Sequence, residues 1–169
     1  MSIYVLDSTS DLSDVQEILH VSNEIFSLEA ENVGPLKPPY DIKEWLNRLQ
    51  HHNGEIIYYK DPINGLIGGF LFLYQRSDDP AEQHIWIAGC RSQLRRQGIM
   101  SQLFIFAEKR KRDAGIKTLT VNTYPLKFPN MPYFLESQQY EVYSRVAPAS
   151  SSTHIDLGSK WCYRKILSI

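Results

Sequence analysis

Apolar residues recur along the first third of the chain at helical spacing. In residues 11–27 they fall three or four positions apart, which predicts an amphipathic helix that Ser10 or Asp11 caps. Glycine and proline pairs then interrupt the pattern, and residues 41–51 resume it as a second expected helix. Both helices come before most of the strand signals.

Runs typical of strands follow, and one helical stretch interrupts them. The expected strands are residues 3–6, 55–60, 66–75, 84–90, 118–124, 140–146 and 161–166. Residues 99–114 are the helical stretch, and Gly115 ends it. The strand at 118–124 is entered after that helix, so we expect it to lie parallel to the strand at 84–90 through a right-handed crossover. With a short helix at 130–137, the pattern predicts a mixed α/β or α+β fold.

Bulk composition narrows the class of protein. The chain has 169 residues, 43% of them apolar and 22% charged, which is typical of one soluble globular domain spanning 1–169. A net charge of −1 does not favour nucleic acid or an anionic membrane as a partner. Two cysteines and no signal-like or membrane-spanning stretch favour the cytoplasm, or cytoplasm and nucleus in a eukaryote.

The segment Arg95–Met100, sequence RRQGIM, lies where the expected strand at 84–90 gives way to the expected helix at 99–114. A helix start offers unpaired N–H groups and the positive end of its dipole to a phosphate. Gly98 allows close approach of the backbone to a ligand, and Arg95 and Arg96 add positive charge. The alternative is a solvated basic loop that caps a helix. The strand–loop–helix–strand context favours phosphate binding.

These residues resemble a motif of the GNAT family of N-acetyltransferases. The motif there is Arg or Gln, two variable residues, Gly, one variable residue, then Gly or Ala. Arg95 and Gly98 match, whereas Met100 departs from it. The order of elements along most of the chain is also similar, and a short helix ending at Gln138-Gln139-Tyr140 resembles a later family motif in divergent form. The resemblance implies a mostly antiparallel sheet with a central parallel strand pair, flanked by about four helices.

The resemblance also implies an acetyl-CoA site. Its pyrophosphate would meet main-chain N–H groups of residues 96–101, and its pantetheine arm would lie between the strands at 84–90 and 119–124. Met100 is compatible with this only if its side chain points into the core. Asn130 would bond the cofactor or else cap a helix, and Asn122, unusual in a strand, needs a polar partner. The residues expected to bind the cofactor are Ala88, Cys90, Arg95, Arg96, Gln97, Gly98, Ile99, Met100, Ser101, Asn122 and Asn130.

Amine acetylation requires a base for the amine and an acid for the leaving thiolate. His84 precedes Arg95 by eleven residues, the offset at which histone-acetylating family members carry a glutamate base, and Glu82 is the fallback. Strand alternation places His84, Trp86 and Ala88 on one face. The family's acid is commonly a tyrosine on the short helix. Leu135 occupies the aligned position, and Tyr133 is the nearest candidate.

Several alternatives concern the partners. The acceptor would be a primary amine of a small molecule, peptide or protein, in a groove walled by residues 31–40 and 148–160. A CoA-binding sensor without catalysis is the second hypothesis. Nucleic-acid binding through residues 91–112 conflicts with the net charge and the lack of an aromatic platform. The basic residues 109–112 are expected on a solvated helix face, with contact to the cofactor's 3′-phosphate as the alternative. His51, His52 and His154 fit no metal-ligand spacing, so we expect no metal, and a monomer or homodimer.

Overall fold

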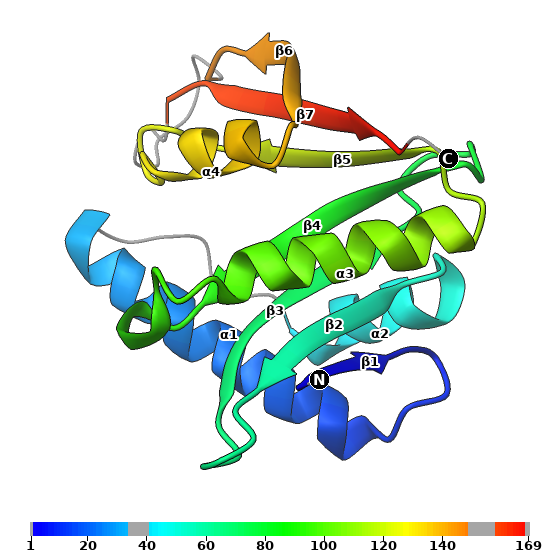
Figure 1. Ribbon diagram of the computed structural model, residues 1–169, viewed down its shortest axis with the longest axis vertical. Coiled ribbons are helices and arrows are strands. Elements are labelled where there is room, and N and C mark those ends of the chain that lie inside the picture. The colour runs from blue at the N-terminus through cyan, green and yellow to red at the C-terminus, as the bar shows by residue number, and fades with distance from the viewer. Residues whose placement is uncertain (1, 34–40, 149–157, 168–169) are drawn as a thin grey trace.

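A computed structural model describes residues 2–33, 41–148 and 158–167 of the chain. Seven strands form one sheet in the order β1-β2-β3-β4-β5-β7-β6 (Figure 1). Their bounds are Ile3–Leu6, Glu55–Lys60, Ile67–Tyr74, Glu82–Cys90, Thr118–Thr123, Glu141–Val146 and Lys160–Ile166, for β1 to β7 in chain order. Among the strands of the described residues, only β4 and β5 pair in parallel. The expected mixed, mostly antiparallel sheet with one parallel pair is confirmed.

Four α-helices flank the sheet in the described residues: α1 (Leu12–Val33), α2 (Ile42–His51), α3 (Ile99–Asp113) and α4 (Met131–Ser137). The helix α1 is longer than its apolar spacing predicted. In α2 the Asp41 carboxylate accepts the Glu44 N–H at 3.0 Å, which caps the helix start. No described helix is long and apolar enough to cross a bilayer.

Two hydrophobic clusters fill the two sides of the sheet. The first lies under α3 and α4 and includes Leu103, Phe104 and Leu135. The second lies under α1 and α2 and includes Ile18, Trp45 and Phe72. Figure 1 shows α3 crossing one side of the sheet, with α1 and α2 on the other. Ile166 on β7 is 65% exposed and Arg164 is also exposed, so this second side is open to solvent over the β7 end of the sheet.

A β-bulge in β4 corrects one expectation about side-chain direction. Phe72 of β3 pairs with Ile87, but its neighbour Leu73 pairs with Ile85, which leaves Trp86 as the extra residue. Trp86 packs against the α1/α2 cluster and Ala88 against the α3/α4 cluster. The prediction that Ala88 shares a face with His84 and Trp86 is therefore wrong, because the inserted residue reverses the alternation beyond it.

Of the basic residues 109–112, Lys109 and Arg110 are exposed as the sequence suggested, but Lys111 is buried and does not belong to the solvated face. Lys111 is only 4% exposed and forms an ion pair with Glu55 of β2, which Arg110 also binds. Lys109 pairs with Asp113 at 2.7 Å. These residues end α3, at the far end of the helix from Gly98, so they cannot contact a phosphate held at its start.

Candidate functional site

The connection from β4 to α3 is held in place by packing and by one arginine. A 3₁₀ turn at Ser92–Leu94 directs Leu94 onto Gly68 of β3, where a Cβ would come within 2.8 Å of Leu94 Cδ1. Arg91 donates from Nε to the Ile67 carbonyl oxygen at 2.7 Å and pairs with Glu24 of α1 at 2.8 Å. Arg91 therefore anchors the loop, and its charge is already neutralised.

The start of α3 has the geometry of an anion site. Gly98 caps the helix with φ 77° and ψ 8°, and Arg96 also has a positive φ of 66°. The Gln102 N–H donates to the Gly98 carbonyl oxygen at 3.0 Å, so the earlier N–H groups, from Ile99 to Ser101, have no intrahelical acceptor. A Cβ at Gly98 would meet nothing within 4 Å, so the space beside this turn is open.

Side chains around this turn leave its backbone accessible. Met100 packs against the α3/α4 cluster, which meets the condition that the sequence set for it. Arg95, Arg96 and Gln97 are exposed on the loop. Ser101 is half-buried, and its hydroxyl accepts from the Gln138 side chain at 3.3 Å. The turn thus presents main-chain donors and two guanidinium groups toward solvent.

The strands β4 and β5 diverge beside this turn. They pair from Glu82 with Thr118 to Ile85 with Val121, and Figure 1 shows them separating toward the start of α3. The Arg91 N–H donates to β3 at the Gly68 carbonyl oxygen, 2.9 Å away. Because backbone groups alternate in direction along a strand, the N–H groups of Cys90 and Ala88 point the opposite way, into the gap that β5 leaves.

Asn122 lies on β5 just beyond the point where the pairing with β4 ends. Its side-chain Oδ1 is buried and has no hydrogen-bond partner among the described residues. Gln83 Oε1 and Tyr163 Oη are also buried without partners, but neither residue lies along the diverging stretch. An unpaired buried acceptor costs about 1–3 kcal/mol, so a partner for Asn122 is the expected explanation.

His84 lies on β4, one residue before the last pair with β5, and is itself paired with Thr120. Its side chain is 5% exposed, and Nδ1 lies 2.8 Å from the Thr120 hydroxyl. Burial, with the positive charges of Arg76 and Lys160, lowers the pKa of His84 to about 3. The imidazole is therefore neutral at pH 7, and in the ligand-free protein it is a weak proton acceptor. Glu82, the fallback base, is the first residue of β4 and not part of the preceding loop.

The tyrosines near α4 occupy unequal environments. Tyr133 is 74% exposed on the outer side of α4, whereas Leu135, at the position aligned with the family tyrosine, is fully buried. Tyr140 is buried and donates to Glu108 at 2.9 Å, and burial followed by the charge of Glu108 raises its pKa far above the usual range. Tyr140 therefore cannot supply a proton near neutral pH.

Asn130 and Cys90 are two further residues that the sequence predicted to bind the cofactor. Asn130 precedes α4 and is exposed, and its side chain makes no capping hydrogen bond, so the capping alternative is not what the structure shows. Cys90 is half-buried, and burial raises the pKa of its thiol, which does not suit a nucleophile. The groove walls proposed at residues 31–40 and 148–160, with His154, lie largely outside the described residues.

An arginine–aromatic cluster beside His84 was not anticipated. The Arg48 guanidinium of α2 lies 3.7 Å from the Trp86 ring centre and 5.1 Å from that of Tyr74. Tyr74 in turn contacts the His84 ring, with centroids 6.0 Å apart. No signal in the sequence joins these residues, because α2 and β4 are far apart along the chain and the bulge determines where Trp86 points.

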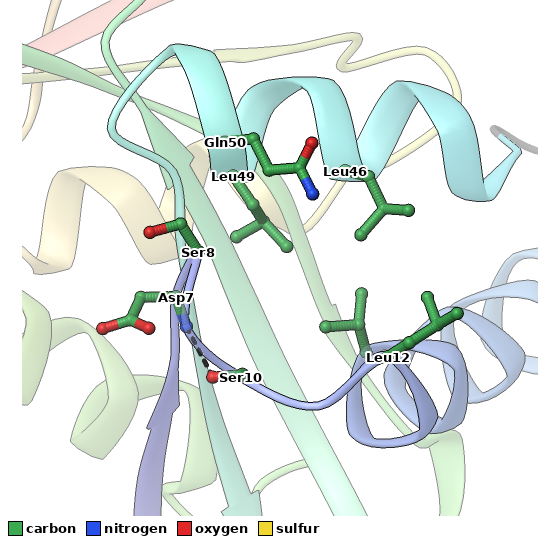
Figure 2. A pocket seen from close by; sticks show the side chains of 8 residues that line it. Asp7, Ser8, Ser10, Leu12, Leu46, Leu49 and Gln50 are labelled. Carbon is green, nitrogen blue, oxygen red and sulfur yellow. Dashed lines mark hydrogen bonds between the residues drawn. The ribbon is translucent and has the colours of Figure 1, made fainter.

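A cavity of about 170 Å³ lies between the loop after β1, the start of α1, and α2. Figure 2 shows Leu46 and Leu49 facing Leu12 across it. Its polar rim is bonded internally: the Asp7 N–H donates to Ser10 Oγ at 2.9 Å. Nothing in it points to chemistry. In the described part of the chain, no three His, Cys, Asp or Glu side chains gather as a metal site.

No family model matches the sequence, and no curated protein matches it. Solved structures do match over nearly the whole chain. A GNAT-family acetyltransferase from Staphylococcus aureus Mu50 superposes with TM-score 0.71 at 17% identity, covering 98% of this chain and 99% of that one. Ribosomal-protein-alanine N-acetyltransferase from Brucella melitensis gives 0.72 at 14% identity, covering 99% and 100%. IAA acetyltransferase from Bacillus cereus gives 0.67 at 13% identity, covering 98% of each chain. The fold is that of GNAT acetyltransferases, as the sequence resemblance implied.

Proposed function

We propose that this chain binds acetyl-CoA and transfers the acetyl group to a primary amine. The observation that supports this best is the juxtaposition of two features: the open start of α3, and the gap where β4 and β5 diverge beside it. One could hold a pyrophosphate and the other an extended pantetheine arm. The similarity to GNAT structures supports the proposal through the fold alone, since identities are 17% or lower for the structures described above.

The residues present fit such a ligand. Main-chain N–H groups from Arg96 to Ser101 would hold the pyrophosphate, with the guanidinium groups of Arg95 and Arg96 adding charge-assisted bonds. The N–H groups of Ala88 and Cys90 would bond the pantetheine arm or the thioester oxygen. Asn122, whose buried Oδ1 has no partner within residues 2–33, 41–148 and 158–167, and Asn130, exposed before α4, would contact the same ligand.

Acetyl-CoA supplies an activated thioester carbonyl, and the chain's own groups supply position and polarisation. A strand N–H directed into the gap, from Ala88 or Cys90, can donate to the oxygen on which negative charge develops. The His84 imidazole, neutral at pH 7, can accept the proton of the attacking amine directly or through water. Tyr133 is our candidate for protonating the thiolate, and solvent is the other source.

The role of His84 as base is the weakest element of this mechanism. A conjugate acid with pKa near 3 lies about four pH units below neutrality, which costs about 5 kcal/mol if the histidine takes a full proton. The base therefore works only if ligand binding raises its pKa. His84→Gln should lower kcat by at least about 10-fold and remove one limb of the pH profile. Unchanged turnover and pH profile in that variant would assign the proton to solvent or Glu82.

The same observations favour a second function, a CoA-binding sensor without catalysis. The low pKa of His84, the exposure of Tyr133 and the buried Leu135 all leave binding better supported than chemistry. Thiol release from acetyl-CoA, measured with a panel of primary amines, separates the two functions. Tight acetyl-CoA binding with no thiol release across the panel would establish the sensor.

Calorimetry with two matched glycine variants tests the cofactor site. Gly98 and Gly115 flank α3, both have positive φ (77° and 85°), and a Cβ at either meets nothing within 4 Å. Gly98→Ala and Gly115→Ala should therefore cost similar stability, about 1 kcal/mol. Only Gly98→Ala should weaken CoA binding, by about 10-fold. Wild-type protein that binds no CoA at millimolar concentration would defeat the proposal, and equal CoA affinities in the two variants would move the site elsewhere.

The remaining assignments stay predictions. We expect a single domain over residues 1–169, a cytoplasmic location, and a monomer or homodimer. We expect no nucleic acid, membrane or metal to be required. The acceptor is a small molecule, or an amine of a peptide or protein.

A further inference from the structure

The side from which an acceptor amine can approach follows from the packing of the sheet. Leu103, Leu135 and their neighbours fill the α3/α4 side of the β4–β5 region. A thioester held between the diverging strands is therefore reachable from the other side. On that side the cover provided by α1 and α2 gives way to the exposed Arg164 and Ile166 of β7.

A row of side chains crosses the sheet on this open side. Directly paired residues point to the same face, and the pairs His84 with Thr120, Thr120 with Arg164, and Arg164 with Glu141 link four strands. Arg164 lies with its guanidinium 5.4 Å from the Tyr143 ring centre. The charges that act on His84 are both positive, those of Arg76 and Lys160.

Arg48 extends this cationic surface on the α2 side. Its guanidinium is stacked 3.7 Å from the Trp86 ring centre, and Nη1 donates to the Glu44 carbonyl oxygen at 3.3 Å. The Glu44 carboxylate, one turn earlier, forms no ion pair with it, and no carboxylate in the described residues does. Arg48 Nε is buried and has no hydrogen-bond partner in the part of the chain that the structure describes. An arginine held flat on a ring keeps its N–H edge available for an oxyanion.

We infer that the acceptor is a small amine that carries an anionic group, recognised by Arg48 and the neighbouring cations Arg76, Lys160 and Arg164. This inference rests on the proposed function. It disfavours polyamines and lysine-rich peptides, because a cationic surface repels them. Glu141 lies directly opposite Arg164 and offsets part of its charge, and Glu82 lies in the neighbouring row, paired with Thr118. The positive character therefore rests mainly on Arg48, Arg76 and Lys160.

Matched amines test this with one enzyme preparation. Phenylalanine is compared with its methyl ester and with phenethylamine, and 2-aminoethylphosphonate with ethylamine, so that carboxylate and phosphonate are scored separately. We expect kcat/KM to be at least about 10-fold higher for an anionic amine than for its neutral partner. Equal or better transfer to the neutral amines would overturn the inference and leave the acetyltransferase proposal standing.

Substitutions in the cationic surface test whether a preference for anionic amines comes from it. Arg48→Gln should bring the ratio of anionic to neutral kcat/KM near one, and Arg76→Gln, at an exposed position, should lower it without affecting folding. Arg145→Gln is the matched control. Arg145 also stacks on a tryptophan, Trp161, at 4.3 Å, but Trp161 packs against the α3/α4 cluster, on the other side of the sheet. A preference that survives Arg48→Gln and Arg76→Gln, or is lost equally in Arg145→Gln, counts against the inference.

If no amine is acetylated, binding measurements still test the anion site separately from the acetyltransferase proposal. The anionic amines are then titrated by calorimetry into CoA-loaded wild-type, Arg48→Gln and Arg145→Gln protein. Binding that depends on Arg48 but not on Arg145 would support the anion site while the acetyltransferase proposal fails. Absence of binding by every anionic amine would overturn the anion site as well.

Discussion

Around the C-terminal half of α3, the buried charges of Glu108 and Lys111 are matched by ion-pair partners, whereas at the β4–β5 junction one buried amide has no partner among the described residues. Glu108 accepts from Tyr140 at 2.9 Å and from Lys165 at 2.7 Å, and the Lys165 ammonium also donates to the Gln138 carbonyl oxygen. At the junction, Asn122 Oδ1 has no partner among the described residues, and His84 is buried with a strongly lowered pKa.

The difference separates polar residues that hold the fold from those available to a ligand. The α3 cluster ties that helix to β7 and to the end of α4, and its hydrogen bonds offset the cost of burial. The junction contains polar groups whose burial lowers the stability of the protein, which is typical of functional sites. Three variants test this contrast.

Glu108→Gln should have the largest effect, a loss of about 3 kcal/mol in unfolding free energy. The change removes the carboxylate and leaves the Lys165 ammonium, 18% exposed, without its counter-charge. Urea denaturation measures it. Lys109→Gln is the control, because Lys109 and Asp113 form an exposed pair on the same helix, and it should change stability by about 0.5 kcal/mol or less. Equal effects in both variants would remove the distinction between the clusters.

His84→Gln should change how stability depends on pH. With a folded pKa near 3 and an unfolded value near 6.5, the unfolded chain binds the extra proton between these pH values. Stability therefore falls as pH decreases through this window. From pH 6.5 to pH 4, wild type should lose about 3 kcal/mol more than the variant. Parallel stability curves for the two proteins would show that His84 is solvated in the folded state.

Asn122→Val should have the smallest effect on stability and the opposite sign. Removing an unpaired buried amide from a strand, and adding a β-branched residue, should raise the unfolding free energy by about 1 kcal/mol. The same change should weaken acetyl-CoA binding by about 10-fold, read by calorimetry. Thr118→Val, on the same face of β5 where β4 is still paired, should leave that affinity unchanged. A destabilised Asn122→Val protein would indicate a structural role for the amide.

The sequence predicted most of the fold because its elements carry strong local patterns. Apolar spacing, strand-type runs and turn residues located the four helices and seven strands of the described residues to within a few residues, except at the C-terminal end of α1. Gly98 and its neighbours marked the start of α3 from local chemistry alone. By contrast, β7 inserts between β5 and β6, an arrangement that depends on long-range pairing and has no local signature.

The candidate site likewise has a part that local sequence predicted and a part that depends on long-range strand pairing. The turn at residues 95–101 could be predicted from the sequence, because a glycine, two arginines and a strand-to-helix transition are all local sequence features. The environment of His84, the direction of Ala88 and the stacking of Arg48 on Trp86 were not, because each depends on the register between β3 and β4. By itself the sequence determined the elements and the open, donor-rich start of α3. Only the tertiary structure decided which polar residues are neutralised and which lie on the open side of the sheet, since burial and partners come from segments distant along the chain.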